Sequence, residues 1–209
     1  EIRTPITNLV TQTEIALSQT RSQKELEDVL YSSLEEFSRM SRMVSDMLFL
    51  AQADNNQLIP DRAIFDLRAE VMKVFDFFEA WAEERNVTLK FNGMPCLTEG
   101  DPQMFRRAIN NLLSNALRYT PEGKAVTVSL REQENNVELV VANPGVPIPE
   151  EHLPRLFDRF YRVDPSRQRK GEGSGIGLAI VKSIVSAHHG KIRVESDAVS
   201  TRFILSVPK

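Results

Sequence analysis

Four glycines at alternate positions open the stretch Gly171-Glu172-Gly173-Ser174-Gly175-Ile176-Gly177-Leu178-Ala179-Ile180-Val181-Lys182, and the residues after them have helical character. A glycine-rich loop that leads into a helix presents free backbone N–H groups, and the helix dipole favours an anion there. A surface turn that needs glycine only for its backbone freedom would show the same pattern. Because the spacing is neither that of a P-loop nor Gly-x-Gly-x-x-Gly, we interpret the stretch as a phosphate-binding loop of another kind.

The composition is typical of a globular protein with one large or two small domains, at 209 residues, 41% hydrophobic and 26% charged. A net charge of −3 gives no general attraction to nucleic acid, so we expect no nucleic-acid partner. The single cysteine, Cys96, excludes an intramolecular disulfide, and we expect it to be a buried filler near a strand. The chain contains no membrane-spanning run. It begins with Glu1 rather than Met, so we expect it to be part of a longer protein.

Residues 1–57 are predicted to form a helical hairpin. Apolar residues recur at helical spacing on both sides of a polar break at 18–22, and Ser22 with Glu25 is typical of a capping box. In the second helix the apolar steps alternate between three and four residues, at Phe37, Met40, Val44, Met47 and Ala51. Two helices alone cannot bury such wide apolar faces, so we predict a homodimer with a four-helix bundle.

Residues 58–209 are predicted to form a second domain, a two-layer α/β sandwich, after a polar linker at 55–61. The predicted helices cover 66–85, 102–119 and the segment from the glycine stretch to 188, and a short helix contains Leu153 and Leu156. Asp101 is the expected N-cap of the helix 102–119, with Pro102 at its first position. The predicted strands cover 87–91, 126–131, 137–142, 191–196 and 202–207.

Candidate ligands lie on the helix 102–119. Asn111 and Asn115 are four residues apart on one face, and Arg118 and Tyr119 follow one turn later. Amide oxygens suit Mg²⁺, and the planar fork of arginine suits phosphate. Two asparagines on a helix can equally be ordinary surface residues, but the phosphate-binding loop downstream favours a functional interpretation.

Two loops add further candidates. The turn that begins with Asn143-Pro144-Gly145 can contact the edge of a flat heterocycle or can be a plain proline turn. The segment 157–162 holds three aromatic residues and two arginines, a pattern typical of a nucleic-acid patch or of a lid whose cations neutralise phosphates. The net negative charge of the chain favours the interpretation as a lid. His152, His188 and His189 lack metal-ligand spacing, so we expect them to be structural.

In this order, the segments resemble the conserved boxes of bacterial sensor histidine kinases, over nearly the whole chain. The resemblance is closest to the heavy-metal subfamily, which responds to copper or silver, because of Asn-Pro-Gly-x-Pro-Ile and Leu-Phe-Asp-Arg-Phe-Tyr-Arg. The matching boxes are the H box at Glu1-Ile2-Arg3-Thr4-Pro5, the N box at 111–119, the G1 box at 143–145, the F box at 156–161 and the G2 box at 173–178.

The resemblance implies a dimeric hairpin followed by the ATP-binding fold of histidine kinases and Hsp90, with ATP and Mg²⁺ as ligands. It implies that Glu1 helps the histidine accept phosphate and that Thr4 positions water during regulator dephosphorylation. Asn115, with Asn111 nearby, would bind Mg²⁺. The other implied ATP-binding residues are Arg118 and Tyr119 at phosphate or ribose, Asn143, Gly145 and Thr201 at adenine, Phe157 and Phe160 at the lid, and Gly173, Gly175, Gly177 and Leu178 at the phosphates. The implied partner is a response regulator, and the parent protein is implied to be membrane-anchored, with this core on the cytoplasmic side of the inner membrane.

The chain departs from the family pattern in four places. Asn143 replaces the usual adenine-reading Asp, Pro147 stands where a second glycine is usual, and Ala198-Val199-Ser200 replaces the usual late glycines. We expect nucleotide binding to survive these changes. The family's phosphoacceptor histidine immediately precedes Glu1 and is absent from this sequence, so we expect the chain itself not to autophosphorylate on histidine.

Two other functions remain open from the sequence. One is an ATPase of the related chaperone or mismatch-repair type, which would release phosphate without a phosphoprotein. The other is a non-enzymatic dimer module that only senses nucleotide. The segment Glu1-Ile2-Arg3-Thr4-Pro5 at the start of a dimer-type hairpin argues against both.

Overall fold

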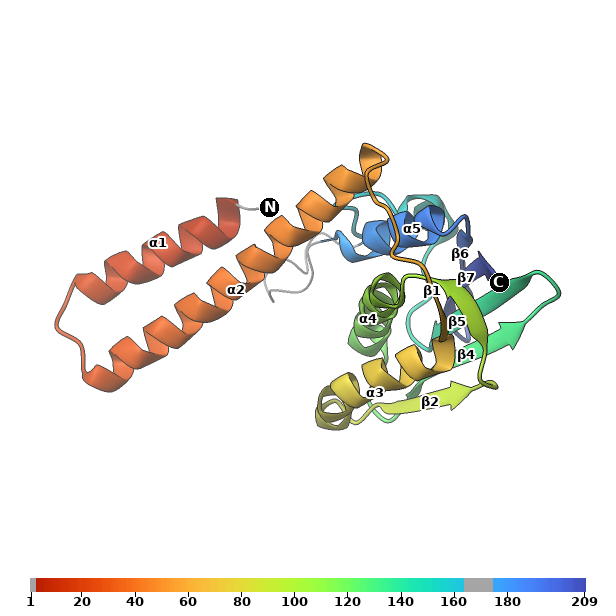
Figure 1. The fold of residues 1–209 in the computed structure, drawn as a ribbon. Coiled ribbons are helices and arrows are strands. Elements are labelled where there is room, and N and C mark those ends of the chain that lie inside the picture. Colours follow the sequence, from red (N-terminus) through yellow and green to blue (C-terminus); the bar gives the residue numbers. More distant parts are fainter. Residues whose placement is uncertain (1–2, 164–174) are drawn as a thin grey trace. The chain divides into compact units, whose positions relative to one another are not determined.

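The computed structural model describes residues 3–163 and 175–209 (Figure 1). The chain forms two compact units, Glu1–Phe49 and Leu50–Lys209, and the division falls within one long helix. The boundary between residues 57 and 58 stays a prediction. No helix in the described ranges is both long enough and apolar enough to cross a membrane.

The first unit contains the helical hairpin, α1 (Arg3–Leu17) and most of α2 (Gln23–Asp54). The capping box is confirmed, because the Ser22 N–H donates to Glu25 Oε2 at 2.8 Å and the Glu25 N–H donates to Ser22 Oγ at 3.3 Å. Between the helices, Gln12 Nε2 donates to Ser32 Oγ at 3.3 Å. Local sequence signals therefore define where the second helix begins.

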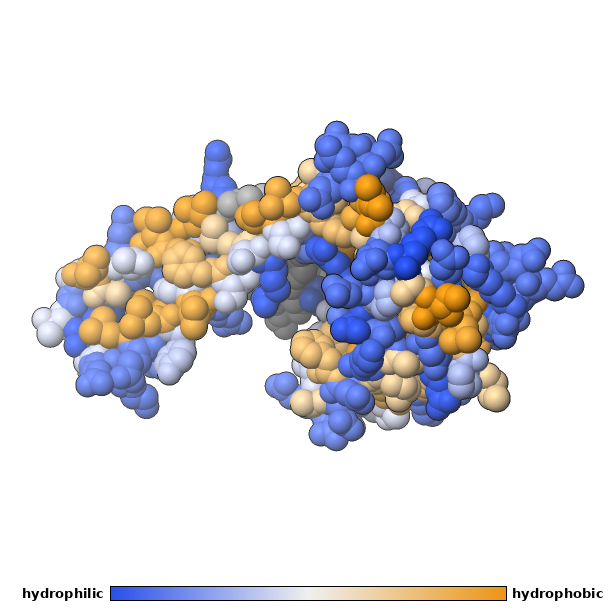
Figure 2. Space-filling view, viewed as in Figure 1, coloured by the Kyte–Doolittle hydropathy of each residue, from blue (hydrophilic) through white to orange (hydrophobic). Residues whose placement is uncertain are grey.

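The hairpin leaves much of its apolar surface exposed. Figure 2 shows an apolar band along both helices. Leu17, Leu30 and Leu34 are 81%, 68% and 61% exposed, although isolated exposed leucines are common on proteins. The exposed apolar residues of this unit are Ile6, Val10, Ile15, Leu17, Leu26, Leu30, Tyr31, Leu34, Phe37, Val44 and Leu48. A contiguous band of this extent is typical of a surface that another chain covers.

The second unit is built on a five-stranded sheet of order β2-β4-β5-β7-β6. Only β2 and β4 are parallel, and the other pairs are antiparallel. The strands are β2 (Thr88–Asn92), β4 (Ala125–Glu132), β5 (Asn136–Asn143), β6 (Lys191–Ser196) and β7 (Thr201–Pro208). The helices α3 (Leu67–Glu84), α4 (Pro102–Tyr119) and α5 (Gly177–Ala187) pack on the sheet. The predicted two-layer α/β sandwich is confirmed.

Two short strands and a 3₁₀ helix complete this unit. The strands β1 (Ala63–Asp66) and β3 (Leu97–Gly100), which were not predicted, form a separate antiparallel pair. Each has only four residues, which is too short for a period of two to stand out. The predicted short helix is a 3₁₀ helix, η1 (Glu150–Arg155).

Helix α4 is fixed in place at its N-terminal half. As predicted, the Asp101 side chain caps it by accepting hydrogen bonds from the N–H groups of Gln103 and Met104, at 2.9 and 3.1 Å. Buried Glu70 on α3 accepts from Lys73 and from Arg106 on α4, both at 2.7 Å. Burial alone would raise the pKa of Glu70, but these two hydrogen bonds outweigh it and lower the pKa.

His188 joins the C-terminal end of α5 to the start of α4. Its Nδ1 donates to the Ile184 carbonyl at 2.8 Å, and its Nε2 accepts from the Asp101 N–H at 3.0 Å. The ring is buried and lies 4.6 Å from the Phe105 ring, centroid to centroid. Both nitrogens of a neutral imidazole are therefore satisfied, and the expected structural role of this histidine is supported.

This arrangement predicts that acid destabilises the second unit through His188. Burial lowers the pKa of His188 from its usual 6.5, although the hydrogen bond to Ile184 opposes the shift. The folded state then binds the proton less readily than the unfolded chain, so stability is full above about pH 6.5 and falls as the pH drops below it. Urea unfolding at pH 7.5 and 5.5, followed by fluorescence of Trp81, the only tryptophan, measures this loss.

The matched variant is His188→Gln, which keeps a polar amide but cannot titrate. We expect it to cost about 1–2 kcal/mol at pH 7.5, through the lost hydrogen bonding, and to lose less stability than the wild type between pH 7.5 and 5.5. Equal losses in the two proteins over this interval would show that His188 does not titrate on unfolding.

Candidate functional site

Asn111 on α4 faces the first residue of α5. Its Nδ2 donates to the Arg107 carbonyl at 3.0 Å, which holds the amide in place. A Cβ atom added at Gly177 would lie 2.8 Å from Asn111 Oδ1, so any larger residue would have to displace the Asn111 amide. Asn115 lies half-buried one turn further along α4. Asn111 therefore lies against the start of α5, and Asn115 is one turn away on the same helix.

The first turn of α5 has backbone N–H groups that the helix itself does not satisfy. The N-cap is Ile176, and no side chain of the described residues caps it. The first helical hydrogen bond runs from the Ile180 N–H to the Ile176 carbonyl at 3.0 Å, so the N–H groups of Gly177, Leu178 and Ala179 have no partner inside the helix. Such donors at the positive end of a helix dipole suit a phosphate group.

Two chain segments meet just before α5. The Phe160 N–H donates to the Gly175 carbonyl at 2.9 Å. Gly175 has φ +70°, and a Cβ there would lie 2.9 Å from Phe160 Cα, so this position requires glycine. Phe160 itself has φ +61°, an uncommon conformation for a bulky residue. Phe157 packs edge-on against Phe203 of β7, with 6.4 Å between the ring centroids. These contacts are consistent with the predicted anchoring role of both phenylalanines.

The end of β5 meets the C-terminal end of α4. Asn143 and Thr201 are paired across β5 and β7, and both are buried. The Asn143 Nδ2 donates to the Pro144 carbonyl at 3.2 Å. A Cβ at Gly145 would lie 2.9 Å from the Tyr119 carbonyl oxygen. The structure therefore brings Asn143, Gly145, Thr201 and Tyr119 to one end of the sheet, beside the helix that carries Asn115.

Four predicted residues are not part of the contacts described above. Glu1 and Gly173 lie outside the described residues. Thr4 is exposed in the first turn of α1, in the other unit. The Arg118 backbone carbonyl accepts a hydrogen bond from Arg85 at 3.3 Å, and its side chain remains half-buried at the end of α4.

Sequence reasoning missed Ser196, which contacts two segments of this region. Its Oγ accepts from the Ile148 N–H at 2.9 Å and lies 2.8 Å from Thr201 Oγ1. The only sequence signal was its position at the end of a predicted strand, which does not reveal its partners.

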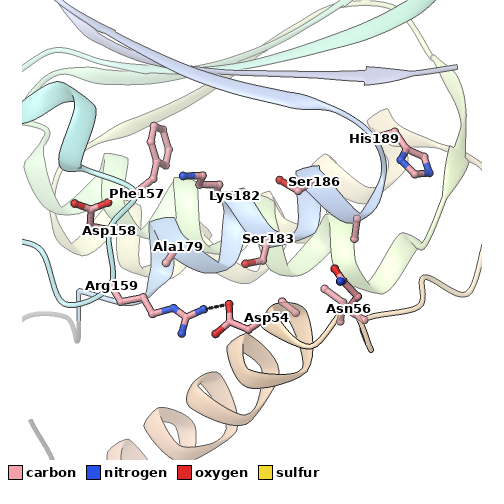
Figure 3. A pocket seen from close by; sticks show the side chains of 13 residues that line it. Asp54, Asn56, Phe157, Asp158, Arg159, Ala179, Lys182, Ser183, Ser186 and His189 are labelled. Atoms are coloured by element: carbon pink, nitrogen blue, oxygen red, sulfur yellow. Dashed lines mark hydrogen bonds and ion pairs between the residues drawn. The ribbon is translucent and has the colours of Figure 1, made fainter.

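A separate hollow of about 700 Å³ follows the outer face of α5 (Figure 3). Lys182, Ser183 and Ser186 of α5 line it, and Arg159 pairs with Asp54 at its rim. The hydrogen bond from Arg159 lowers the pKa of Asp54. Of the predicted binding residues that the structure describes, Phe157 alone lines this hollow.

The chemistry of the Asn111 cluster fits a metal bound together with phosphate. In the described part of the chain, no group of three His, Cys, Asp or Glu residues is placed to hold a metal. Amide oxygens of Asn115 and Asn111 are hard, neutral donors that leave the charge of Mg²⁺ available to phosphate oxygens. Donors for phosphate lie at the start of α5, next to Asn111.

Comparisons with known proteins agree with this geometry. Residues 100–209 match the family described as histidine kinase-, DNA gyrase B- and HSP90-like ATPases. Residues 1–56 match the His Kinase A (phospho-acceptor) domain. The chain belongs to the sensor histidine kinases. The predicted family, fold and ATPase-type domain are confirmed, and the phospho-acceptor domain argues against the chaperone-type ATPase alternative.

Individual relatives support membership of the histidine kinases. The chain is 78% identical to the probable sensor kinase SilS of Salmonella typhimurium over 213 residues, which are 100% of this chain and 43% of SilS. It is 70% identical to the sensor histidine kinase CusS of Escherichia coli (strain K12) over 208 residues, which are 100% of this chain and 43% of CusS. The chain thus spans less than half the length of these relatives.

Solved histidine kinases share the fold. The Acinetobacter baumannii histidine kinase AdeS has a TM-score of 0.83 at 24% identity, over 99% of this chain and 96% of that chain. The histidine kinase ThkA, solved in complex with the response regulator protein TrrA, has a TM-score of 0.79 at 23% identity, over 100% of this chain and 58% of that chain.

Proposed function

We propose that this histidine kinase core uses Mg-ATP to phosphorylate a histidine immediately before Glu1, and that the phosphoryl group then passes to an aspartate of a response regulator. The observation that carries the proposal is the placement of the α5 N-terminus against Asn111 through Gly177, in a chain that also has a phospho-acceptor domain. Backbone N–H groups at a helix start, an amide pair for the metal and a phospho-acceptor domain are parts that phosphoryl transfer between ATP and histidine requires.

Each predicted residue then has a role. Asn115, supported by Asn111, holds Mg²⁺, and the bound ion neutralises charge on the phosphates. Gly173, Gly175, Gly177 and Leu178 place backbone N–H groups against the phosphates. The remaining roles fall to Arg118 and Tyr119 at phosphate or ribose, Asn143, Gly145 and Thr201 at adenine, Phe157 and Phe160 at the lid, Glu1 beside the acceptor histidine, and Thr4 at the water that dephosphorylates the regulator.

Dimerisation through residues 1–57 is part of this proposal. The exposed apolar band of the hairpin needs a cover, and a second copy of the same hairpin gives a four-helix bundle. Residues 58–209 form the catalytic domain in this scheme. The two domains then supply acceptor and donor of one phosphoryl transfer.

The intact protein is proposed to be anchored in the inner membrane, with this core on its cytoplasmic side. The similarity to SilS and CusS over the whole chain, together with the heavy-metal subfamily motifs, supports copper or silver ions as the signal. The net negative charge of the chain gives no reason to propose a nucleic-acid partner.

The test is incubation of labelled Mg-ATP with a protein extended upstream to include the residue before Glu1. We expect acid-labile, base-stable phosphate on the extended protein and none on residues 1–209 alone, because the acceptor histidine is absent from the shorter chain. Changing that upstream histidine to glutamine is the control, and it should remove the label. Steady phosphate release without any phosphoprotein would instead support a simple ATPase.

A further inference from the structure

Three polar side chains form a row across β5, β7 and β6 at the predicted base-binding end of the sheet. Asn143 is paired with Thr201, and Ser196 is paired with Thr201 on its other side. Residues directly opposite one another in antiparallel strands point to the same face of the sheet. Asn143 and Thr201 are buried, and Ser196 is half-buried. Ser196 therefore lies in the same row as the two proposed adenine-contacting residues, with Thr201 between it and Asn143.

The Ser196 hydroxyl joins two parts of the base-binding region. Its Oγ accepts from the Ile148 N–H at 2.9 Å, and Ile148 belongs to the proline-rich segment that follows Asn143. The same Oγ lies 2.8 Å from Thr201 Oγ1. A serine hydroxyl has one donor and two acceptor sites, so with Ile148 on one acceptor it can still donate to Thr201. One side chain thus holds the Ile148 backbone and can orient the Thr201 hydroxyl.

The row presents a defined pattern of donors and acceptors. The Asn143 Nδ2 is directed to the Pro144 carbonyl at 3.2 Å, which leaves Oδ1, an acceptor, for a ligand. When Thr201 accepts from Ser196, its own hydroxyl hydrogen is free to donate. Adenine has an amino donor next to a ring-nitrogen acceptor, which matches this pattern. Guanine has a carbonyl acceptor in place of the amino group, which does not.

We propose that Ser196 is a positioning residue that sets the preference of this site for adenine over guanine. It acts through Thr201 and Ile148 and does not itself contact the base. The proposal rests on the proposed nucleotide function. It predicts that removing the Ser196 hydroxyl changes base preference, whereas a residue that only supported the fold would weaken both nucleotides alike.

The experiment measures the affinities of the full chain for Mg-ATP and Mg-GTP by calorimetry. For Ser196→Ala we expect the affinity for Mg-ATP to fall about 5- to 10-fold, and the ratio of ATP to GTP affinity to fall by about the same factor, because one to two hydrogen bonds are lost. Ser196→Thr keeps the hydroxyl, so the Mg-ATP affinity and the ratio of ATP to GTP affinity should both stay near their wild-type values. Ser206→Ala, at the opposite end of the β6–β7 pair, is the matched control and should change neither.

A second readout needs no nucleotide. Hydrogen exchange of the Ile148 amide should become about 5-fold faster in Ser196→Ala and stay unchanged in Ser206→Ala. If the wild type binds Mg-ATP but Ser196→Ala keeps the ATP-to-GTP ratio, the positioning role is wrong and the nucleotide function stands. If the wild type binds neither nucleotide, the proposed function fails, and this inference fails with it.

Discussion

Replacing Asn115 with alanine is expected to abolish Mg-ATP binding while the chain stays folded and dimeric. Asn115 lies half-buried on α4, one turn beyond the Asn111 amide that faces Gly177. Loss of a metal-ligating oxygen from a site with few other protein ligands is expected to lower the affinity for Mg-ATP by at least about 100-fold. Alanine is a better helix former than asparagine, so α4 should persist.

Calorimetric titration with Mg-ATP measures this effect, and sedimentation analysis of the same protein reports whether the dimer remains. Gln103→Ala is the matched control, because it removes an exposed amide side chain from the first turn of the same helix. We expect Gln103→Ala to bind Mg-ATP as the wild type does. Unchanged Mg-ATP affinity in Asn115→Ala would show that Asn115 is not a metal ligand. The functional interpretation of the helix 102–119 would then be wrong.

Helix α4 shows what local sequence can predict. Asp101, Pro102 and the apolar period after them are neighbours in sequence, and each acts on backbone groups within one turn. The start of the helix and the shared face of Asn111 and Asn115 therefore follow directly from residue order. The capping box at Ser22 and Glu25 was predictable for the same reason.

Features that depend on distant partners were not predictable in this way. The four-residue strands β1 and β3 are stable because they pair with each other, and 30 or more residues separate them along the chain. The partners of Ser196 follow from the register of β6 against β7 and from a turn 48 residues earlier. His188 likewise contacts Asp101, 87 residues away. Register and helix packing decide these contacts, and no single segment encodes them.

The glycine stretch was predictable only in part. Its spacing indicated a loop before a helix, but two of its glycines are explained only by their neighbours in space. Gly177 leaves room for the Asn111 amide on α4, and Gly175 is required by the Phe160 backbone. The sequence could therefore suggest a phosphate-binding loop, whereas the reason for glycine at these positions lies in contacts with α4 and the segment before the loop.

Of the glycines that the structure describes with an ordinary backbone conformation, Gly190, at the other end of α5, is expected to tolerate substitution least. A Cβ there would lie 2.5 Å from the Ser206 carbonyl oxygen, and 2.8 and 2.9 Å from methyl groups of Val207 and Val185. Ser206 is paired with Lys191 of β6 on one side and with Glu138 of β5 on the other, so the sheet holds its backbone in place. We expect Gly190→Ala to lower the free energy of unfolding by about 3 kcal/mol, at the upper end for overpacking.

Urea unfolding of the full chain, followed by Trp81 fluorescence, measures this loss in the second unit. Gly123→Ala is the informative control, because Gly123 has φ +74° and a Cβ there would meet no atom within 4 Å. Gly123→Ala should then lower the free energy of unfolding by about 1–2 kcal/mol, through the left-handed backbone conformation alone. A loss in Gly190→Ala no larger than in Gly123→Ala would mean that the β6–β7 ladder yields to the added methyl group. The close contact at Gly190 would then not limit which residue can occupy this turn.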